Sequence, residues 1–175
     1  MNLKDFIKKY REEINNRKFE EVYSLADKEL SYAEVGKLTE LLYKCGVDPL
    51  KYMSEVPDGY AYNSNISKID IPDGVTSIGD FAFEYCTSLT SVNISNSVKN
   101  IGGEAFSGCS KLTSITIGNG VTSIGNWAFD DCTSLKSITY KGSKNQWNVI
   151  DLERSWDVGS SLEMIHCTDG VIKLA

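Results

Sequence analysis

A repeat of 23 residues restricts the fold of this 175-residue chain more than any other feature of its sequence. Within each unit, apolar and polar residues alternate, as in the stretch LTSVNI at residues 89–94, and this alternation predicts a strand with one buried face. A unit of this length cannot bury its own apolar column, so neighbouring units must stack as a solenoid of parallel strands around a shared core. The recurring columns include Ile69/Val92/Ile115/Ile138, Ile71/Ile94/Ile117/Tyr140, Phe83/Phe106/Phe129 and Cys86/Cys109/Cys132.

Three columns of the repeat have specific expected roles. The phenylalanines are expected to form an aromatic stack inside the solenoid. The cysteines are expected to be a buried row of small apolar side chains with free thiols, because the column lies in a packed core and a reducing cell disfavours disulfides. The glycines of the third column, Gly79, Gly102 and Gly125, are expected to give the permissive backbone angles that a tight turn needs.

The repeat unit resembles that of a known family. Units such as residues 71–90, IPDGVTSIGDFAFEYCTSLT, are similar to the BspA-type leucine-rich repeats, and three full copies cover residues 67–136. The tail, from Ile138 through Trp147 to Gly170, is similar to the closing unit of that family. The resemblance implies a short leucine-rich-repeat solenoid with parallel strands, which together with N-terminal helices gives an α+β fold class.

Faint matches to the period also precede the first full unit. The resemblance makes asparagine an acceptable occupant of the cysteine column, since asparagine and cysteine alternate there in leucine-rich repeats. We therefore expect half a repeat before residue 67. The matching pairs are Tyr60/Phe83, Asn63/Cys86 and Ile66/Leu89.

Residues 1–53 have helical periodicity. A second short helix is expected around residues 19–25, and the pair Ser31 and Glu34 has the form of a capping box that opens a third helix. Gly46 and Pro49 are expected to end that helix. An amphipathic helix at the N-terminus is predicted by the spacing of Leu3, Phe6, Ile7, Tyr10 and Ile14.

These features divide the chain into a helical N-terminal domain, residues 1–53, and a solenoid, residues 54–175, with a C-terminal cap from about residue 141. A bundle of this size has a small core of its own. We therefore expect it to dock on the open first coil, which hides the exposed edge of the sheet. The alternative is that the helices form part of a partner-binding surface.

The reactive residues of the chain do not form a catalytic pattern. The single histidine, His166, is adjacent to Cys167, and neighbours on a strand point to opposite faces, so the pair is a poor catalytic dyad. Phosphate-loop, zinc-protease and serine-hydrolase motifs do not occur in the sequence. We therefore expect a protein without enzymatic activity, cofactor or metal.

Two surfaces are candidates for binding. The expected concave strand face presents Asp70, Asn93, Thr116 and Thr139, which are small and polar. The second surface surrounds the residue just before the buried Ala-Phe pair of each unit, and exposed aromatics flanked by charges there are typical of interface anchors. Packing of these side chains on neighbouring turns is an equally good interpretation. We call this set the aromatic rim; its members are Phe81, Glu84, Tyr85, Glu104, Trp127, Asp130 and Asp131.

Charge and targeting signals restrict the partner. The formal charge is −6, from 18 basic and 24 acidic residues, and the sequence has no Lys/Arg stripe of the kind that grips a phosphate backbone. The first residues lack the pattern of a signal peptide, and we expect no membrane segment and a cytoplasmic location. The sequence thus favours an intracellular protein-protein interaction module that binds a protein partner through the solenoid and the helical domain together. We expect it to be a monomer or a small homo-oligomer that does not bind nucleic acid directly.

Two alternatives to this function stay open. Resemblance to small repeat proteins of gut bacteria and their phages suggests a phage- or mobile-element-encoded inhibitor of a bacterial defence protein, such as an anti-CRISPR. The second alternative is a cell-surface adhesin-type protein, since proteins with this repeat are often displayed or secreted.

Overall fold

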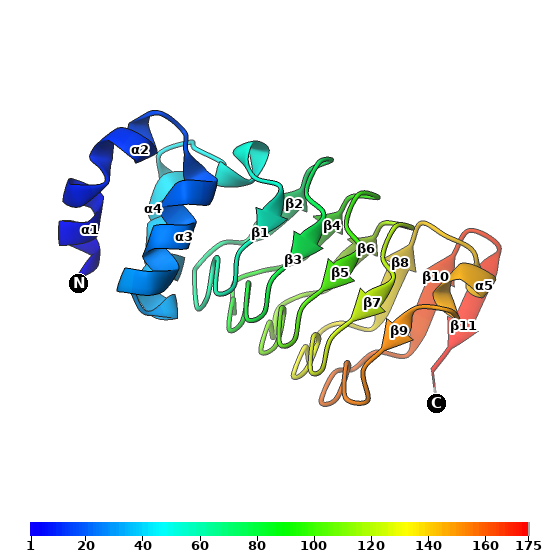
Figure 1. Cartoon of the computed structure of the whole chain (residues 1–175). Helices are drawn as coiled ribbons and strands as arrows, with labels where there is room; N and C mark the ends of the chain where they lie inside the picture. The colour runs from blue at the N-terminus through cyan, green and yellow to red at the C-terminus, as the bar shows by residue number, and fades with distance from the viewer. Residues whose placement is uncertain (175) are drawn as a thin grey trace.

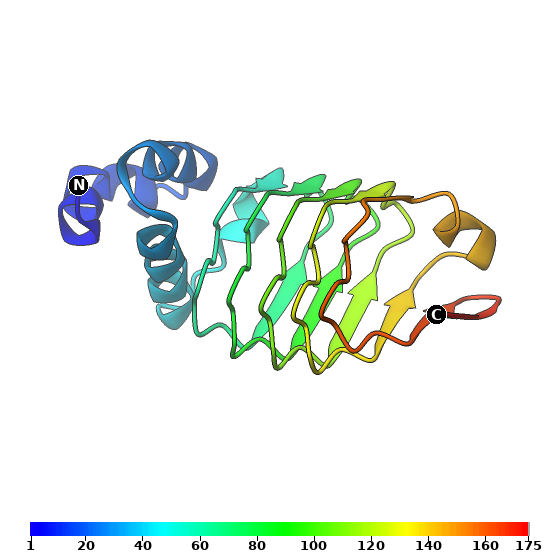
Figure 2. The ribbon, with the colours of Figure 1, turned by 90° about the horizontal axis from the view of Figure 1, so that it is seen from below.

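The computed structural model describes residues 1–174 as a helical N-terminal part followed by a solenoid whose coils stack in one direction (Figure 1). Viewed from below, the helices lie at one end of the stack and the C-terminus lies at the other (Figure 2). The helical part consists of α1 (Leu3–Lys9), α2 (Arg11–Asn15), α3 (Phe19–Glu29), α4 (Tyr32–Lys44) and the 3-10 helix η1 (Pro49–Tyr52).

The helices follow the sequence pattern with one exception. Ser31 and Glu34 form the predicted capping box at the start of α4, and Gly46 has a left-handed φ of 73° just after its end. The expected single helix at the N-terminus is instead broken at Tyr10, which has φ −107° and ψ 30° and separates α1 from α2. The Tyr10 hydroxyl donates a hydrogen bond to Oε1 of Glu29 at 2.8 Å, so the residue at the break contacts the end of α3.

The longer strands form one sheet that continues through the repeat. Ile69, Val92, Ile115 and Ile138 pair in register along it, and all four are buried, as the alternation predicted. The first five strands are parallel and the sixth is antiparallel to the fifth. The strands are β2 (Lys68–Ile71), β4 (Ser91–Ile94), β6 (Ser114–Ile117), β8 (Ser137–Tyr140), β10 (Met164–Cys167) and β11 (Gly170–Lys173).

Short strands of two residues form a second sheet, so each coil lines the core twice. All its pairs are parallel. The short helix α5 (Lys144–Trp147) interrupts the coil that leads to its last strand. The strands are β1 (Glu55–Val56), β3 (Ser77–Ile78), β5 (Asn100–Ile101), β7 (Ser123–Ile124) and β9 (Asp151–Leu152).

An aromatic column runs through the core between these sheets. Phe83, Phe106 and Phe129 stack with ring centroids 5.1 and 5.5 Å apart and interplanar angles of 9° and 3°, which confirms the predicted stack. Edge-on and tilted contacts extend the column beyond the repeat at both ends. The additional rings belong to Tyr23 and Tyr60 on the N-terminal side and to Trp156, Trp147 and Tyr140 on the C-terminal side.

The cysteine column is buried beside this aromatic column. The thiols of Cys109 and Cys132 each donate to a backbone carbonyl, of Phe83 and Phe106 respectively, at 3.2 Å. Burial raises the pKa of Cys109 well above its usual value and that of Cys132 to about 12. The three cysteines are therefore protonated core side chains with free thiols, as the sequence indicated.

The helical part covers the first coil of the solenoid. The hydroxyl of Thr39 on α4 donates to the carbonyl of Tyr60, and the Tyr23 hydroxyl bonds Thr39 in turn. Gly36 lies flat against the backbone of Tyr62, where an added Cβ would be 3.0 Å from the carbonyl carbon. The helices thus cap the exposed edge, as their small core led us to expect.

The half coil that precedes the first full repeat is one residue shorter than predicted. Ser64, and not Asn63, occupies the cysteine column, where its hydroxyl lies 3.5 Å from the Cys86 thiol and its side chain is buried. Asn63 is exposed and has φ 49°, which matches the backbone of Tyr85 in the next coil. The expected assignment of Asn63 is therefore wrong, because the coil spacing here is 22 residues.

The repeated glycines have a different role from the one expected. Gly79, Gly102 and Gly125 are not among the residues with left-handed φ. A Cβ at Gly102 would lie 2.6 Å from the carbonyl carbon of Gly79, and one at Gly125 would lie 2.6 Å from the nitrogen of Gly103. Glycine is required here because successive coils approach each other too closely for any side chain.

Candidate functional site

The aromatic rim lies at the coil corners that follow the short strands. Phe81, Glu104 and Trp127 have left-handed φ values of 57°, 52° and 55°, and Tyr85 and Asp131 adopt φ of 55° and 51° four residues after a member of that column. Such angles cost roughly 1–2 kcal/mol for a residue with a Cβ. Each coil therefore carries two left-handed positions, although most of the residues there are not glycine.

Backbone hydrogen bonds between coils hold these corners in place. The amide of Phe81 donates to Gly103 at 2.9 Å, and that of Glu104 donates to Asn126 at 2.9 Å. The amide of Trp127 donates to the carbonyl of Ser155 at 3.0 Å. Because these hydrogen bonds between coils fix the backbone of each corner, the rim side chains project from a rigid surface.

The aromatic members of the rim differ in exposure. Trp127 is 44% exposed and Tyr85 is 46% exposed, so both stand outside the core. Phe81 is half-buried and packs on Tyr32 at the start of α4, with ring centroids 5.8 Å apart. The two sequence interpretations thus apply to different residues: Trp127 and Tyr85 face solvent, while Phe81 anchors the helical cap.

The acidic members of the rim lie close enough to affect one another. Glu84 is 6% exposed, and desolvation followed by the charge of Glu104 raises its pKa. Desolvation also raises the pKa of Asp130, with a further contribution from Asp131. Glu84 is therefore a buried member of a surface on which the sequence led us to expect exposed charges.

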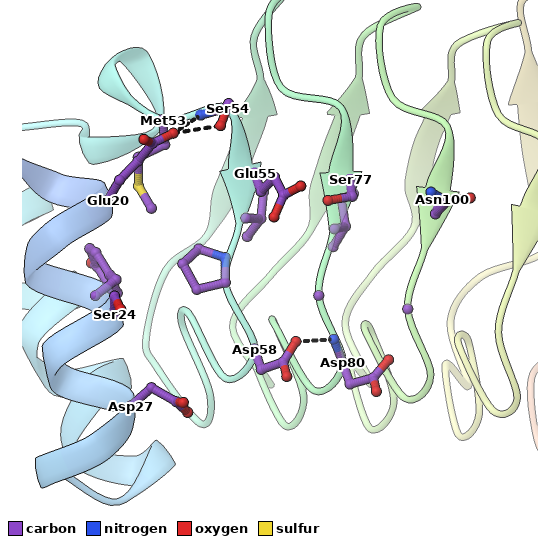
Figure 3. A pocket seen from close by; sticks show the side chains of 16 residues that line it. Glu20, Ser24, Asp27, Met53, Ser54, Glu55, Asp58, Ser77, Asp80 and Asn100 are labelled. Atoms are coloured by element: carbon purple, nitrogen blue, oxygen red, sulfur yellow. Dashed lines mark hydrogen bonds between the residues drawn. The ribbon is translucent and has the colours of Figure 1, made fainter.

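A groove of about 640 Å³ lies between α3 and the first coils, next to the rim (Figure 3). Two carboxylates of the groove, Glu20 and Asp27, come from α3, and two more, Asp58 and Asp80, come from the coil corners. The carboxylate of Glu20 accepts a hydrogen bond from the amide of Ser54. The amide of Asp80 donates to Oδ1 of Asp58 at 2.8 Å, and desolvation raises the pKa of Asp58. The groove is acidic, since none of its described lining residues is lysine or arginine.

This groove could not be predicted from the sequence because its two walls are far apart in the chain. The carboxylates of α3 alternate with buried positions as on any amphipathic helix, and no local pattern places them beside Asp58. One feature of the sequence did point to the groove: the helices were expected to cap the first coil. A helix that covers this coil must lie beside its corners.

The strand face is polar, as expected, and wider than four strands. Asp70, Asn93, Thr116 and Thr139 lie in one row, and His166 of β10 continues it. Six strands of four residues cover roughly 380 Å² at ~4.8 Å between strands and ~3.3 Å per residue. Ile165 is buried, His166 is exposed and Cys167 is partly buried, so the adjacent histidine and cysteine point to opposite faces of the strand.

Within residues 1–174, no group of three or more His, Cys, Asp or Glu side chains is arranged to hold a metal ion. The same residues include no helix with the length and apolarity needed to cross a bilayer.

Three solved structures are similar to parts of the chain. A leucine-rich cell surface protein from Faecalibacterium prausnitzii shares 28% identity over 50% of this chain and 35% of its own, with a TM-score of 0.34. The pneumococcal vaccine antigen PcpA shares 20% over 64% and 39%, with a TM-score of 0.39. A leucine-rich repeat protein of T. pallidum shares 21% over 66% of each chain, with a TM-score of 0.37. The matched part of this chain thus covers between about a third and two thirds of the length of these proteins.

Comparison with sequence families gives a firmer result. A search of curated proteins found no significant match to the chain. The profile of the BspA-type leucine-rich repeat region matches residues 54–172 in six copies. With this match over more than half of its residues, and with the stacked parallel coils described above, the chain belongs to the BspA-type leucine-rich repeat family.

Proposed function

We propose that this protein is a non-catalytic module that acts inside the cell by binding a protein partner through the aromatic rim. The observation that carries the proposal is the exposure of Trp127 and Tyr85 on corners fixed by hydrogen bonds between coils. Tryptophan and tyrosine are the side chains that most often anchor protein interfaces. Their place on a rigid surface supports recognition, since little conformational entropy is lost on binding.

Strain at the rim supports the same proposal. Left-handed residues other than glycine cost free energy and are concentrated at functional sites. The first left-handed position of each corner is a glycine, Gly59, in the first coil. In the following coils the same position is occupied by Phe81, Glu104 and Trp127. These side chains are kept where glycine would relieve the strain, which is consistent with a role for the side chains themselves.

The size of the strand face also favours a role for the rim. A standard interface takes about 800 Å² from each partner, twice the roughly 380 Å² of the strand face. The strand face is also polar and without large side chains. A stable complex therefore needs the rim, the helical cap or both.

Photo-crosslinking in living source cells tests the proposal. The crosslinking residue p-benzoylphenylalanine is placed at Trp127, at Thr116 on the strand face, or at Glu12 on α2 as the control. We expect a discrete crosslinked protein from Trp127 and none from Glu12. Crosslinks from Thr116 alone would move the interface to the strand face, and no crosslinked protein from any position would refute the proposed function.

The crosslinked protein also separates the alternatives. A bacterial defence protein would favour an inhibitor, and a component of the cell exterior would favour an adhesin. Any other intracellular protein would favour an interaction module of the cell itself.

A further inference from the structure

We propose that the aromatic rim recognises a basic segment of the partner, in which arginine or lysine side chains contact the rim carboxylates and aromatic faces. The inference rests on the proposed function and specifies the chemistry of the partner. It is carried by three features of the rim: its one-sided charge, a buried carboxylate without a cation, and aromatic side chains open to solvent.

The corners up to and including those of the rim carry only negative charges; Arg154 lies in the next corner, one residue before Ser155, whose carbonyl accepts from the Trp127 amide. The four corner segments, residues 57–64, 79–87, 102–110 and 125–134, contain no lysine or arginine. The nearest lysines along the chain after the third and fourth segments are Lys111 and Lys136. Such a row of carboxylates attracts cationic groups and repels anionic ones. The carboxylates in these segments are Asp58, Asp80, Glu84, Glu104, Asp130 and Asp131.

Glu84 is the observation that points most directly to a cationic ligand. The residue is more than nine-tenths buried, its carboxylate interacts with the hydroxyl of Tyr85, and the like charge of Glu104 acts on it. None of the ion pairs formed within residues 1–174 involves Glu84. Buried carboxylates are normally paired with a cation. A guanidinium or ammonium group from a partner would supply the missing charge between Glu84 and Glu104.

The aromatic side chains complete a site for such a group. The rings of Tyr62 and Tyr85 meet edge to face, with centroids 5.9 Å apart, and Tyr85 and Trp127 are each more than two-fifths exposed. Cations bind over the faces of tryptophan and tyrosine, and the planar guanidinium of arginine stacks well on them. Charge and aromatic surface therefore favour the same ligand, with arginine preferred over lysine.

The spacing of the rim indicates how the segment lies. Tyr85, Glu104 and Trp127 belong to three successive coils, about 4.8 Å apart along the stack. An extended segment that runs along the solenoid axis would pass all three corners within a few residues. It would thus place several basic side chains on the rim at once.

Fluorescence anisotropy with short labelled peptides tests the inference. The probe is a peptide of alternating arginine and serine, compared with peptides that have lysine or glutamate in place of arginine. The rim variant carries Glu104→Gln, Asp130→Asn and Asp131→Asn. Its control, Glu12→Gln, Glu21→Gln and Asp73→Asn, removes the same charge from exposed carboxylates outside the rim.

We expect the arginine peptide to bind at about 50 mM salt, where screening is weak. Binding should weaken roughly tenfold in the rim variant and less than about twofold in the control, since each exposed pair contributes modestly. Equal losses in the two variants, or equal binding of the glutamate peptide, would overturn the inference. Failure of the arginine peptide to bind at all would also overturn it.

Quenching of Trp127 fluorescence gives a second readout that needs no ligand. Trp147 and Trp156 are buried, so Trp127 is the tryptophan most open to an ionic quencher. Relative to a free, neutral tryptophan derivative, Trp127 should be quenched more strongly by caesium ions and more weakly by iodide ions, and the rim variant should reduce both differences. If a partner crosslinks from Trp127 but the peptide and quenching tests fail, the proposed function stands and the basic partner is refuted.

Discussion

Removing the central ring of the aromatic column is the sharpest test of how the solenoid is stabilised. Phe106 has no exposed surface and stacks on Phe83 and Phe129 at 5.1 and 5.5 Å, so Phe106→Ala leaves a cavity with rings on both sides. Replacing a buried phenylalanine by alanine costs about 3–5 kcal/mol. The neighbouring coils can collapse little, because their backbones are already hydrogen-bonded to each other.

This loss is a large share of the stability of a typical domain, about 5–15 kcal/mol. At roughly 2–4 °C per kcal/mol for a chain of this length, Tm should fall by about 6–20 °C. Urea unfolding followed by circular dichroism measures the change in the free energy of unfolding, and calorimetry measures the change in Tm.

Phe81→Ala is the matched control, because Phe81 is half-buried and contacts the ring of Tyr32 at the edge of the cap. Its loss should be about 0.5–1.5 kcal/mol, the range for a single aromatic pair. If Phe106→Ala costs less than about 1 kcal/mol, or no more than Phe81→Ala, the column is not a main source of stability.

Three further predictions concern the cap, the thiols and the carboxylates. Gly36→Leu should detach the helices, since the position already lacks room for a Cβ against Tyr62; limited proteolysis should then release them, while undiminished resistance would contradict the packing. A thiol reagent should label Cys45, which is exposed, quickly and Cys167 slowly in the folded protein, and rapid labelling of Cys86, Cys109 or Cys132 before unfolding would show that the column is not closed. Glu84 and Asp130 have raised pKa values, so the folded protein takes up their protons at higher pH than the unfolded chain, and Tm should rise as pH falls from 7 towards their pKa. Below pH 4.5 Tm should fall, because hydrogen bonds lower the pKa values of Glu20 and Glu40 and protonation of these carboxylates removes their stabilisation. If the Tm of a Glu84→Gln variant still rose by the same amount between pH 7 and the acidic maximum, Glu84 would not be a source of that rise.

The regular part of the fold could be predicted from the sequence because each position of the repeat is used several times. The columns of Ile69 and Phe83 indicate burial at every unit, so a chance match in one unit does not mislead. The cap could be predicted for a different reason: an exposed first coil needs a cover, and the amphipathic helices have too small a core to stand alone.

The features that could not be predicted depend on contacts between coils. The half coil is one residue shorter than the repeat, so Ser64 occupies the cysteine column. Counting 23 residues back from Cys86 does not reveal this missing residue. The repeated glycines are compatible with either a left-handed backbone or a close approach of two coils. Only the φ values and the distance from Gly102 to Gly79 in the structure distinguish between these two roles. The burial of Glu84 likewise depends on the neighbouring corner and not on its local sequence.

The strand β11, which runs antiparallel to β10, has a consequence for how proteins of this design can change in length. With helices at one end and a reversed strand at the other, extra units are accommodated by duplication within the middle of the array. Each inserted unit of 23 residues would leave both ends untouched and lengthen the row of corners by one. A gene could thereby adjust the number of contacts with a repetitive ligand in whole steps, without redesigning any existing surface.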